Sequence, residues 1–219
     1  WVTISADGTS VYVTNYGDNT VSMYSRNTTT GQLTALSPAT IATGTGPYGV
    51  TISADGTSVY VANYGGRTVS MYSRNTTTGQ LTALSPATIA TGVNPRGVTI
   101  SADGTSVYVA NYGDNTVSMY SRNTTTGQLT ALSPATIATG ANPLWVTISA
   151  DGTSVYVTNY GDNTVSMYSR NTTTGQLTAL SPATIATGTS PYGVTISADG
   201  TSVYVVNYVG RTVSMYKRN

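Results

Sequence analysis

Five aspartates recur at a spacing of 48 residues, and each is followed by glycine: Asp7, Asp55, Asp103, Asp151 and Asp199. In a ring of repeats these carboxylates would form a circle that could bind a metal ion or transfer protons. An Asp-Gly pair is also a strong signal for a tight turn, because the aspartate side chain bonds its own backbone. We therefore interpret the five aspartates as turn residues, and we predict no metal site and no catalytic residue.

Other groups that carry chemistry are scarce. The 219-residue chain contains no cysteine, no histidine and no glutamate, and 8% of its residues are charged. Thiolate and imidazole chemistry are thereby excluded, and we predict no cofactor. The net charge of +1 gives no electrostatic basis for nucleic-acid binding. No apolar run reaches the roughly 18 residues of a membrane span, and no signal-peptide pattern opens the chain, so we predict no membrane insertion.

An internal repeat organises the chain. The string "VTISADGTSVYV" begins at residues 2, 50, 98, 146 and 194. The repeat divides a single domain, residues 1–219, into units 2–49, 50–97, 98–145 and 146–193 and a partial unit 194–219. Alternating Val, Thr and Tyr between turn signals predicts strands at 2–5, 10–15, 20–25 and 33–43 of the first unit.

Four short antiparallel strands per repeat, with no helical periodicity, are typical of β-propeller blades. A β-solenoid is the competing repeat fold, but its coils are usually shorter and its strands parallel. We predict an all-β propeller of five four-stranded blades, the last one incomplete, that closes into a ring. Pro38 predicts that the fourth strand lies at the sheet edge.

The repeat resembles a known family. The stretch "VYVTNYGDNTVSMYSRNTTTGQLTAL" followed by "IATGTGPYGVTISADG" resembles the YVTN repeat of archaeal and bacterial surface-layer propellers. It is also similar to the lactonase-type propellers that include 6-phosphogluconolactonase. The resemblance covers the whole chain and implies an extracellular or cell-surface location. Members of those families usually have seven blades.

Tyrosine is the large residue of the repeat. Fifteen of the 17 tyrosines repeat the positions of Tyr12, Tyr16 and Tyr24, and the chain has no phenylalanine. A tyrosine array could stack against a ligand, but a buried aromatic between blades explains all three positions. We interpret them as packing residues.

The few positions that differ between units point to a binding face. Seven of the 48 positions vary among the four complete units, and all lie in the turn between the second and third strands, at its edge, or in the crossover to the next unit. Both segments meet on one face of an antiparallel blade, where loops carry binding residues. The predicted ligand-binding residues are Trp1, Asp18, Tyr48, Arg67, Arg96, Asp114, Leu144, Trp145, Asp162, Tyr192 and Arg211.

Aromatic and arginine side chains suit recognition of a protein or a carbohydrate. We therefore predict a non-enzymatic recognition module that binds one of these partners. One alternative is an engineered or recently amplified repeat protein without a ligand. A lactonase-like hydrolase is a weaker alternative, because it would need His, Glu or converging carboxylates. The third strand of the last unit, 212–216, would form an open edge that could pair with another copy, and Lys217 would discourage such pairing.

Overall fold

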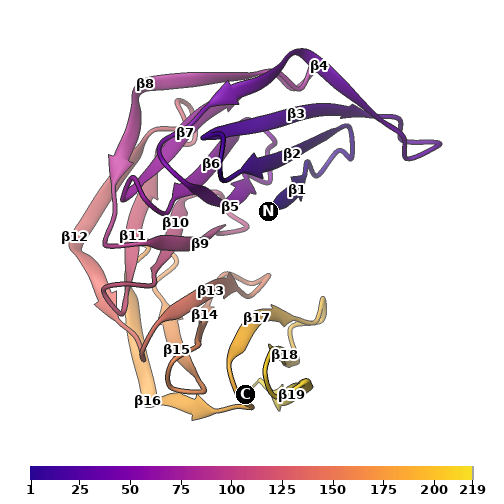
Figure 1. Cartoon of the computed structure of the whole chain (residues 1–219). Coiled ribbons are helices and arrows are strands. Elements are labelled where there is room, and N and C mark those ends of the chain that lie inside the picture. Colours follow the sequence, from indigo (N-terminus) through magenta and orange to yellow (C-terminus); the bar gives the residue numbers. More distant parts are fainter. Residues whose placement is uncertain (219) are drawn as a thin grey trace.

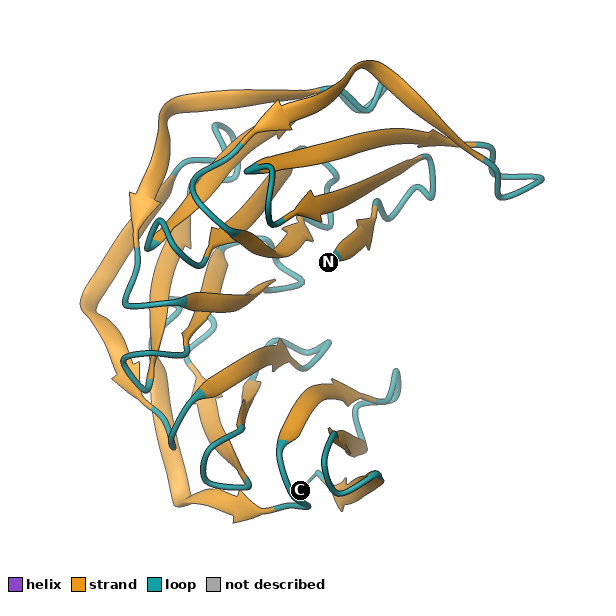
Figure 2. Ribbon diagram, in the orientation of Figure 1, coloured by secondary structure: helices purple, strands orange, loops and turns teal. Residues whose placement is uncertain are grey.

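The computed structural model describes residues 1–218, which form strands and turns without a helix (Figure 2). Each antiparallel sheet is one blade, with strands in sequence order from inside to outside. The strands are, in blade 1, β1 (Val2–Ile4), β2 (Ser10–Asn15), β3 (Thr20–Arg26) and β4 (Leu33–Ala42); in blade 2, β5 (Pro47–Ile52), β6 (Ser58–Asn63), β7 (Thr68–Arg74) and β8 (Leu81–Ala90); in blade 3, β9 (Pro95–Ile100), β10 (Ser106–Asn111), β11 (Thr116–Arg122) and β12 (Leu129–Ala138); in blade 4, β13 (Pro143–Ile148), β14 (Ser154–Asn159), β15 (Thr164–Arg170) and β16 (Leu177–Ala186); and in blade 5, β17 (Pro191–Ile196), β18 (Ser202–Asn207) and β19 (Thr212–Lys217). The predicted all-β propeller architecture is confirmed.

The strand bounds follow the local sequence. The inner strand of blade 2 begins at Pro47, three residues before the repeat boundary at Val50. Its Asp-Gly turn places Gly56 at φ 69°, a conformation that glycine adopts without steric cost. The outer strand β8 contains Pro86 at the sheet edge, where no neighbour needs its missing N–H.

Apolar side chains pack between neighbouring blades. Tyr12 and Met23 of blade 1 are fully buried against Tyr72 and Leu81 of blade 2. The equivalent residues form the clusters between blades 2 and 3 and between blades 3 and 4. The packing role predicted from the sequence therefore holds for the tyrosines at the positions of Tyr12 and Tyr24 in the internal blades.

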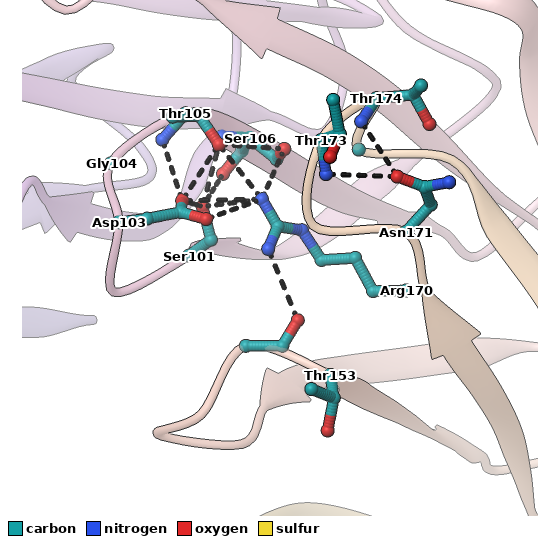
Figure 3. A network of polar contacts seen from close by, with 12 residues as sticks. Ser101, Asp103, Gly104, Thr105, Ser106, Thr153, Arg170, Asn171, Thr173 and Thr174 are labelled. Atoms are coloured by element: carbon teal, nitrogen blue, oxygen red, sulfur yellow. Dashed lines mark hydrogen bonds and ion pairs between the residues drawn. The ribbon is translucent and has the colours of Figure 1, made fainter.

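An arginine from each later blade binds the Asp-Gly turn of the blade before it. In Figure 3, Arg170 of blade 4 reaches the turn that carries Asp103 in blade 3. Its Nη2 lies 3.0 Å from the Asp103 carboxylate and donates to Thr105 and Ser106 at 2.9 Å. The same ion pair joins Arg74 to Asp7, Arg122 to Asp55 and Arg218 to Asp151. The five aspartates are turn residues, as predicted, and four of them also join neighbouring blades.

The five blades form an open arc. Figure 1 shows blade 1 at one end and blade 5 at the other, with an opening between them. The buried clusters of the described residues lie between successive blades, and none joins blade 5 to blade 1. Met215 of blade 5 is 74% exposed, whereas Met119 of blade 3 is 1% exposed. The predicted closed ring is therefore wrong, because each end blade presents an apolar face without a neighbour.

Candidate functional site

The innermost strands bring the variable crossover residues together at one face of the arc. Tyr48, Arg96, Leu144 and Tyr192 each follow the first proline of β5, β9, β13 or β17. The hydroxyl oxygens of Tyr48 in blade 2 and Tyr192 in blade 5 lie 2.8 Å apart. Residues that are 144 positions apart in the sequence are therefore hydrogen-bonded in the centre of the arc.

Arg96 is surrounded by tyrosine rings. Its guanidinium carbon lies 4.3 Å from the ring centroid of Tyr112, 5.1 Å from that of Tyr48 and 5.2 Å from that of Tyr64. The negative faces of the rings stabilise a cation that is partly removed from water. The buried Nε of Arg96 has no hydrogen-bond partner among the described residues. It is therefore a donor that a bound oxygen atom could satisfy.

The Tyr192 hydroxyl is neutral at physiological pH. Burial, together with the hydrogen bond to Tyr48, raises the pKa of Tyr192 to about 12. A neutral hydroxyl both donates and accepts hydrogen bonds, as the hydroxyl groups of a sugar do.

Two tryptophans stack beside these residues. The rings of Trp1 and Trp145 have their centroids 4.2 Å apart and are inclined by 37°. Each is paired with a threonine on the second strand, and the hydroxyl of Thr158 donates to the Tyr192 carbonyl. Blades 2 and 3 have Gly and Ala at these two positions, and a Cβ on Gly49 would overlap the Arg96 carbonyl oxygen. In blades 1 and 4 the tryptophan therefore occurs with a threonine on the second strand, and in blades 2 and 3 the glycine occurs with an alanine.

A pocket of about 550 Å³ opens beside Arg96. Its walls are mainly aromatic and aliphatic, and Arg96 is its charged residue. A neighbouring hollow of about 220 Å³ contains Trp1 and Tyr48. Aromatic walls with a cation and several hydroxyls suit an uncharged or anionic polyhydroxylated ring. The pocket is lined by Arg96, Tyr112, Leu144, Tyr160, Tyr192, Val206 and Tyr208.

The predicted binding residues divide into two groups. Arg96, Leu144 and Tyr192 line the larger pocket, and Trp1, Tyr48 and Trp145 lie next to them. The charged residues of the turns between second and third strands line neither hollow. Asp114 and Asp162 accept hydrogen bonds from the backbone of their own crossovers. This second group, which is exposed, comprises Asp18, Arg67, Asp114, Asp162 and Arg211.

The sequence analysis missed part of the pocket wall. Tyr112, Tyr160 and Tyr208 share the repeat position of Tyr16 and line the pocket, so packing between blades does not describe this position. Tyr16 and Tyr208 are 55% and 69% exposed. A signal was present in the sequence, because these tyrosines follow the last asparagine of the second strand, on the same face as the variable turns.

The fold is that of a β-propeller with a pocket lined mainly by residues of its inner strands and of the segments that follow its second strands. The sequence matches the family described as "Lactonase, 7-bladed beta-propeller" over residues 2–90, 83–136 and 131–219. The chain belongs to this family. No curated protein sequence matches it.

Solved structures with the same fold include two proteins named for lactone chemistry. A periplasmic gluconolactonase of Pseudomonas aeruginosa is 23% identical, with a TM-score of 0.79; the match covers 100% of this chain and 65% of that one. A candidate 6-phosphogluconolactonase of Bacteroides fragilis is 18% identical, with a TM-score of 0.83 and coverage of 99% and 65%. A protein of Lactobacillus plantarum is 22% identical, with a TM-score of 0.86 and coverage of 100% and 66%. The chain thus spans about two thirds of the length of these structures.

The family corrects the predicted function. A non-enzymatic recognition module was expected, because the chain has no His, no Glu and no converging carboxylates. The match to a lactonase family, supported by neighbours named gluconolactonase and 6-phosphogluconolactonase, overturns that expectation. That expectation rested on the premise that ring opening requires a carboxylate or imidazole base. In the described residues there is no helix long and apolar enough to cross a membrane.

Proposed function

We propose that the chain is a lactonase-like hydrolase that opens the ring of a sugar lactone in the pocket beside Arg96. The observation that carries this proposal is the buried Nε of Arg96, a charged donor to which no residue of the described part of the chain is hydrogen-bonded, at the wall of a tyrosine-lined pocket. A lactone presents a carbonyl oxygen that becomes negatively charged when water attacks the carbonyl carbon. A fixed cationic donor stabilises that charge more than it stabilises the neutral substrate.

The chemistry can be written from these residues. The lactone carbonyl oxygen accepts a hydrogen bond from Arg96, and the tyrosine walls stack against the sugar ring. Water adds to the carbonyl carbon, the bond from that carbon to the ring oxygen breaks, and the ring oxygen takes a proton. The product is an open hydroxy acid, which ionises and releases one proton. The hydroxyls of Tyr112, Tyr160 and Tyr192, which line the pocket, would bind the sugar hydroxyls.

Arg96→Gln tests the proposal against a matched arginine. Release of acid from glucono-1,5-lactone is measured in a pH-stat for the parent, for Arg96→Gln and for Arg67→Gln, whose arginine is exposed in a turn. Loss of a charged oxyanion donor lowers kcat/KM by about 100-fold to 1,000-fold, and Arg67→Gln should match the parent. Arg96→Gln with full activity and an unchanged melting temperature would place the reaction elsewhere.

The proposal extends to location. We expect the protein to act outside the cytoplasm, in the cell envelope or beyond it. This agrees with the surface-layer repeat that the sequence resembles and with the relative of Pseudomonas aeruginosa that is described as periplasmic. Fractionation of cells that carry the native gene would test this location.

A further inference from the structure

The third strand of blade 5 borders a groove that runs along blade 4. This groove has a volume of about 400 Å³. The groove is lined by Tyr156, Val165 and Met167 of blade 4, by Leu180, Ser181, Pro182 and Ile185 of β16, and by Val203, Tyr216, Lys217 and Arg218 of blade 5. Leu180 and Ile185 are 40% and 37% exposed. The groove is mainly apolar, with two cationic residues in its lining, and lies outside the candidate active site.

The same place is filled between the earlier blades. In blades 2, 3 and 4 the first residue of the outer strand, Leu81, Leu129 or Leu177, is 5–6% exposed. Leu81 packs on Tyr12, Val21 and Met23 of the preceding blade. These residues correspond, three repeats later, to Tyr156, Val165 and Met167. The groove therefore has the shape and lining of a leucine site.

Two hydrogen bonds accompany that leucine at each filled interface. Tyr12, Tyr60 and Tyr108 donate through their hydroxyls to the carbonyls of Gly79, Gly127 and Gly175, at 2.6–2.7 Å. The side chains of Gln80, Gln128 and Gln176 donate to the carbonyls of Ser37, Ser85 and Ser133, at 2.9–3.0 Å. Within residues 1–218, neither the Tyr156 hydroxyl nor the Ser181 carbonyl makes the corresponding bond. Both residues line the groove.

Steric contact explains why glycine occupies this position at the filled interfaces. A Cβ on Gly79 would lie 2.6 Å from the Ser10 hydroxyl, and a Cβ on Gly175 would lie 2.5 Å from that of Ser106. Both glycines also have positive φ. Ser154 occupies the equivalent position beside the groove. A ligand that reaches the Tyr156 hydroxyl must therefore carry glycine there.

The edge of β19 supplies the backbone partners. In blade 2, β7 pairs with β8 with Arg74 opposite Leu81 and Tyr72 opposite Ala83. In blade 5, β19 has β18 on one side and no strand on the other within the described residues. An extended peptide can add to such an edge through main-chain hydrogen bonds, with side-chain pockets giving specificity.

We propose that this groove binds an extended peptide strand with the sequence Gly-Gln-Leu-Thr-Ala-Leu, in which Gly-Gln is the pair that precedes each outer strand of this chain and Leu-Thr-Ala-Leu is the start of the strand. The peptide runs antiparallel to β19. Its glycine carbonyl accepts from Tyr156, its glutamine donates to the Ser181 carbonyl, and its first leucine fills the groove. This site is independent of the proposed hydrolase activity.

The test is binding of a synthetic peptide with the sequence of residues 173–186. Fluorescence anisotropy of the labelled peptide, titrated with the 219-residue protein, should show saturable binding with a Kd below about 1 mM. Peptides with Gly175→Val or Leu177→Asn should bind at least about 10-fold more weakly, since one clashes and the other places a polar amide where the leucine side chain would fill the groove. Hydrogen exchange should slow at the amides of Thr212–Lys217 when the parent peptide is bound.

Two protein variants place the site. Tyr156→Phe removes the donor and should weaken binding by about 5-fold to 10-fold, whereas Tyr204→Phe changes the same repeat position on the open face of blade 5 and should leave binding unchanged. Absence of binding, equal binding of the parent and Gly175→Val peptides, or protection outside β19 would overturn the proposal. A dimer that the peptide dissociates would support it, with the occupant then an outer strand of a second copy.

Fusing the strand covalently to the protein tests the same site without depending on the affinity of a free peptide. Joining a second copy of residues 172–186 directly after Asn219 continues the repeat in register. The fused strand should raise the urea midpoint and abolish binding of the free peptide. A fused protein that unfolds at the parent midpoint and still binds the peptide would show that the strand does not enter the groove.

Discussion

Truncation of one inter-blade arginine should destabilise the interface between two blades. Arg122 has a fully buried side chain and lies 3.1 Å from the Asp55 carboxylate. It also donates to the Tyr60 hydroxyl at 2.9 Å and to the Gly104 carbonyl at 3.2 Å. Arg26 has the same repeat position in blade 1, and its guanidinium donates to the Gly8 carbonyl. Arg122 therefore represents the arginines with inter-blade bonds, and Arg26 is a matched arginine for which the structure shows only a bond within its own blade.

The expected loss of stability depends on which groups each truncation leaves without a partner. Removal of one member of a buried ion pair costs about 3–5 kcal/mol. The Asp55 side chain is 42% exposed and water can solvate its charge, so we expect about 3 kcal/mol for Arg122→Ala. Arg26→Ala loses one hydrogen bond, which is worth about 1 kcal/mol.

Urea unfolding measures the difference. With a slope of about 2 kcal/mol per molar urea, the midpoint should fall by about 1.5 M for Arg122→Ala and about 0.5 M for Arg26→Ala. Equal shifts for the two variants would refute the conclusion that the arginine stabilises the interface. Retention of the fold is checked by circular dichroism before the titrations are compared.

Three further predictions concern acid stability, the pH dependence of activity and the tryptophan stack. Burial alone would raise the pKa of Asp55 and Asp103, but hydrogen bonds from serine and threonine, together with the neighbouring arginine, lower it to about 2. A lowered folded-state pKa stabilises the protein above the unfolded value of about 4, so urea midpoints should be constant from pH 7 to 5 and fall between pH 4 and 2. The pKa shift corresponds to about 2.5 kcal/mol of stability per carboxyl, which solvent screening of the partly exposed side chains reduces to about 1 kcal/mol. Asp55→Asn should flatten the dependence of the urea midpoint on pH, and an unchanged slope would contradict this prediction. No carboxylate lines the pocket, so lactone hydrolysis should rise with hydroxide concentration from pH 6 to 9, and a plateau at pH 7 would indicate a general base that we have not identified. Trp145→Gly gives blade 4 the residue of blades 2 and 3 and should change the melting temperature by less than about 3 °C, as measured by calorimetry; a larger loss would mean that the stack with Trp1 stabilises the arc.

The sequence predicted those features that depend on one repeat. Strand positions, the Asp-Gly turn and the edge position of Pro38 follow from local propensity and backbone hydrogen bonding. The convergence of Tyr48, Arg96 and Tyr192 could also be predicted, because equivalent positions of a repeat meet on one face of the arc.

Other features depend on relations between repeats. Tyr112 and its copies never vary, so a comparison of units could not mark them as pocket residues. Arg170 contacts residues 64 and 65 positions earlier in the chain, and no local pattern shows that pairing. The arc is open because of the angle between successive blades. Since the units are nearly identical, their sequences do not show what that angle is.

The direction of the arginine contacts gives the chain an order of assembly. At all four described interfaces the later blade supplies the arginine and the earlier blade the aspartate. At the first three, the later blade also supplies the glycine carbonyl and the earlier blade the tyrosine hydroxyl. During synthesis from the N-terminus, the aspartate and tyrosine of one unit can form these bonds only after the next unit has been made. We therefore expect each blade to gain its inter-blade bonds one repeat later than its own strands.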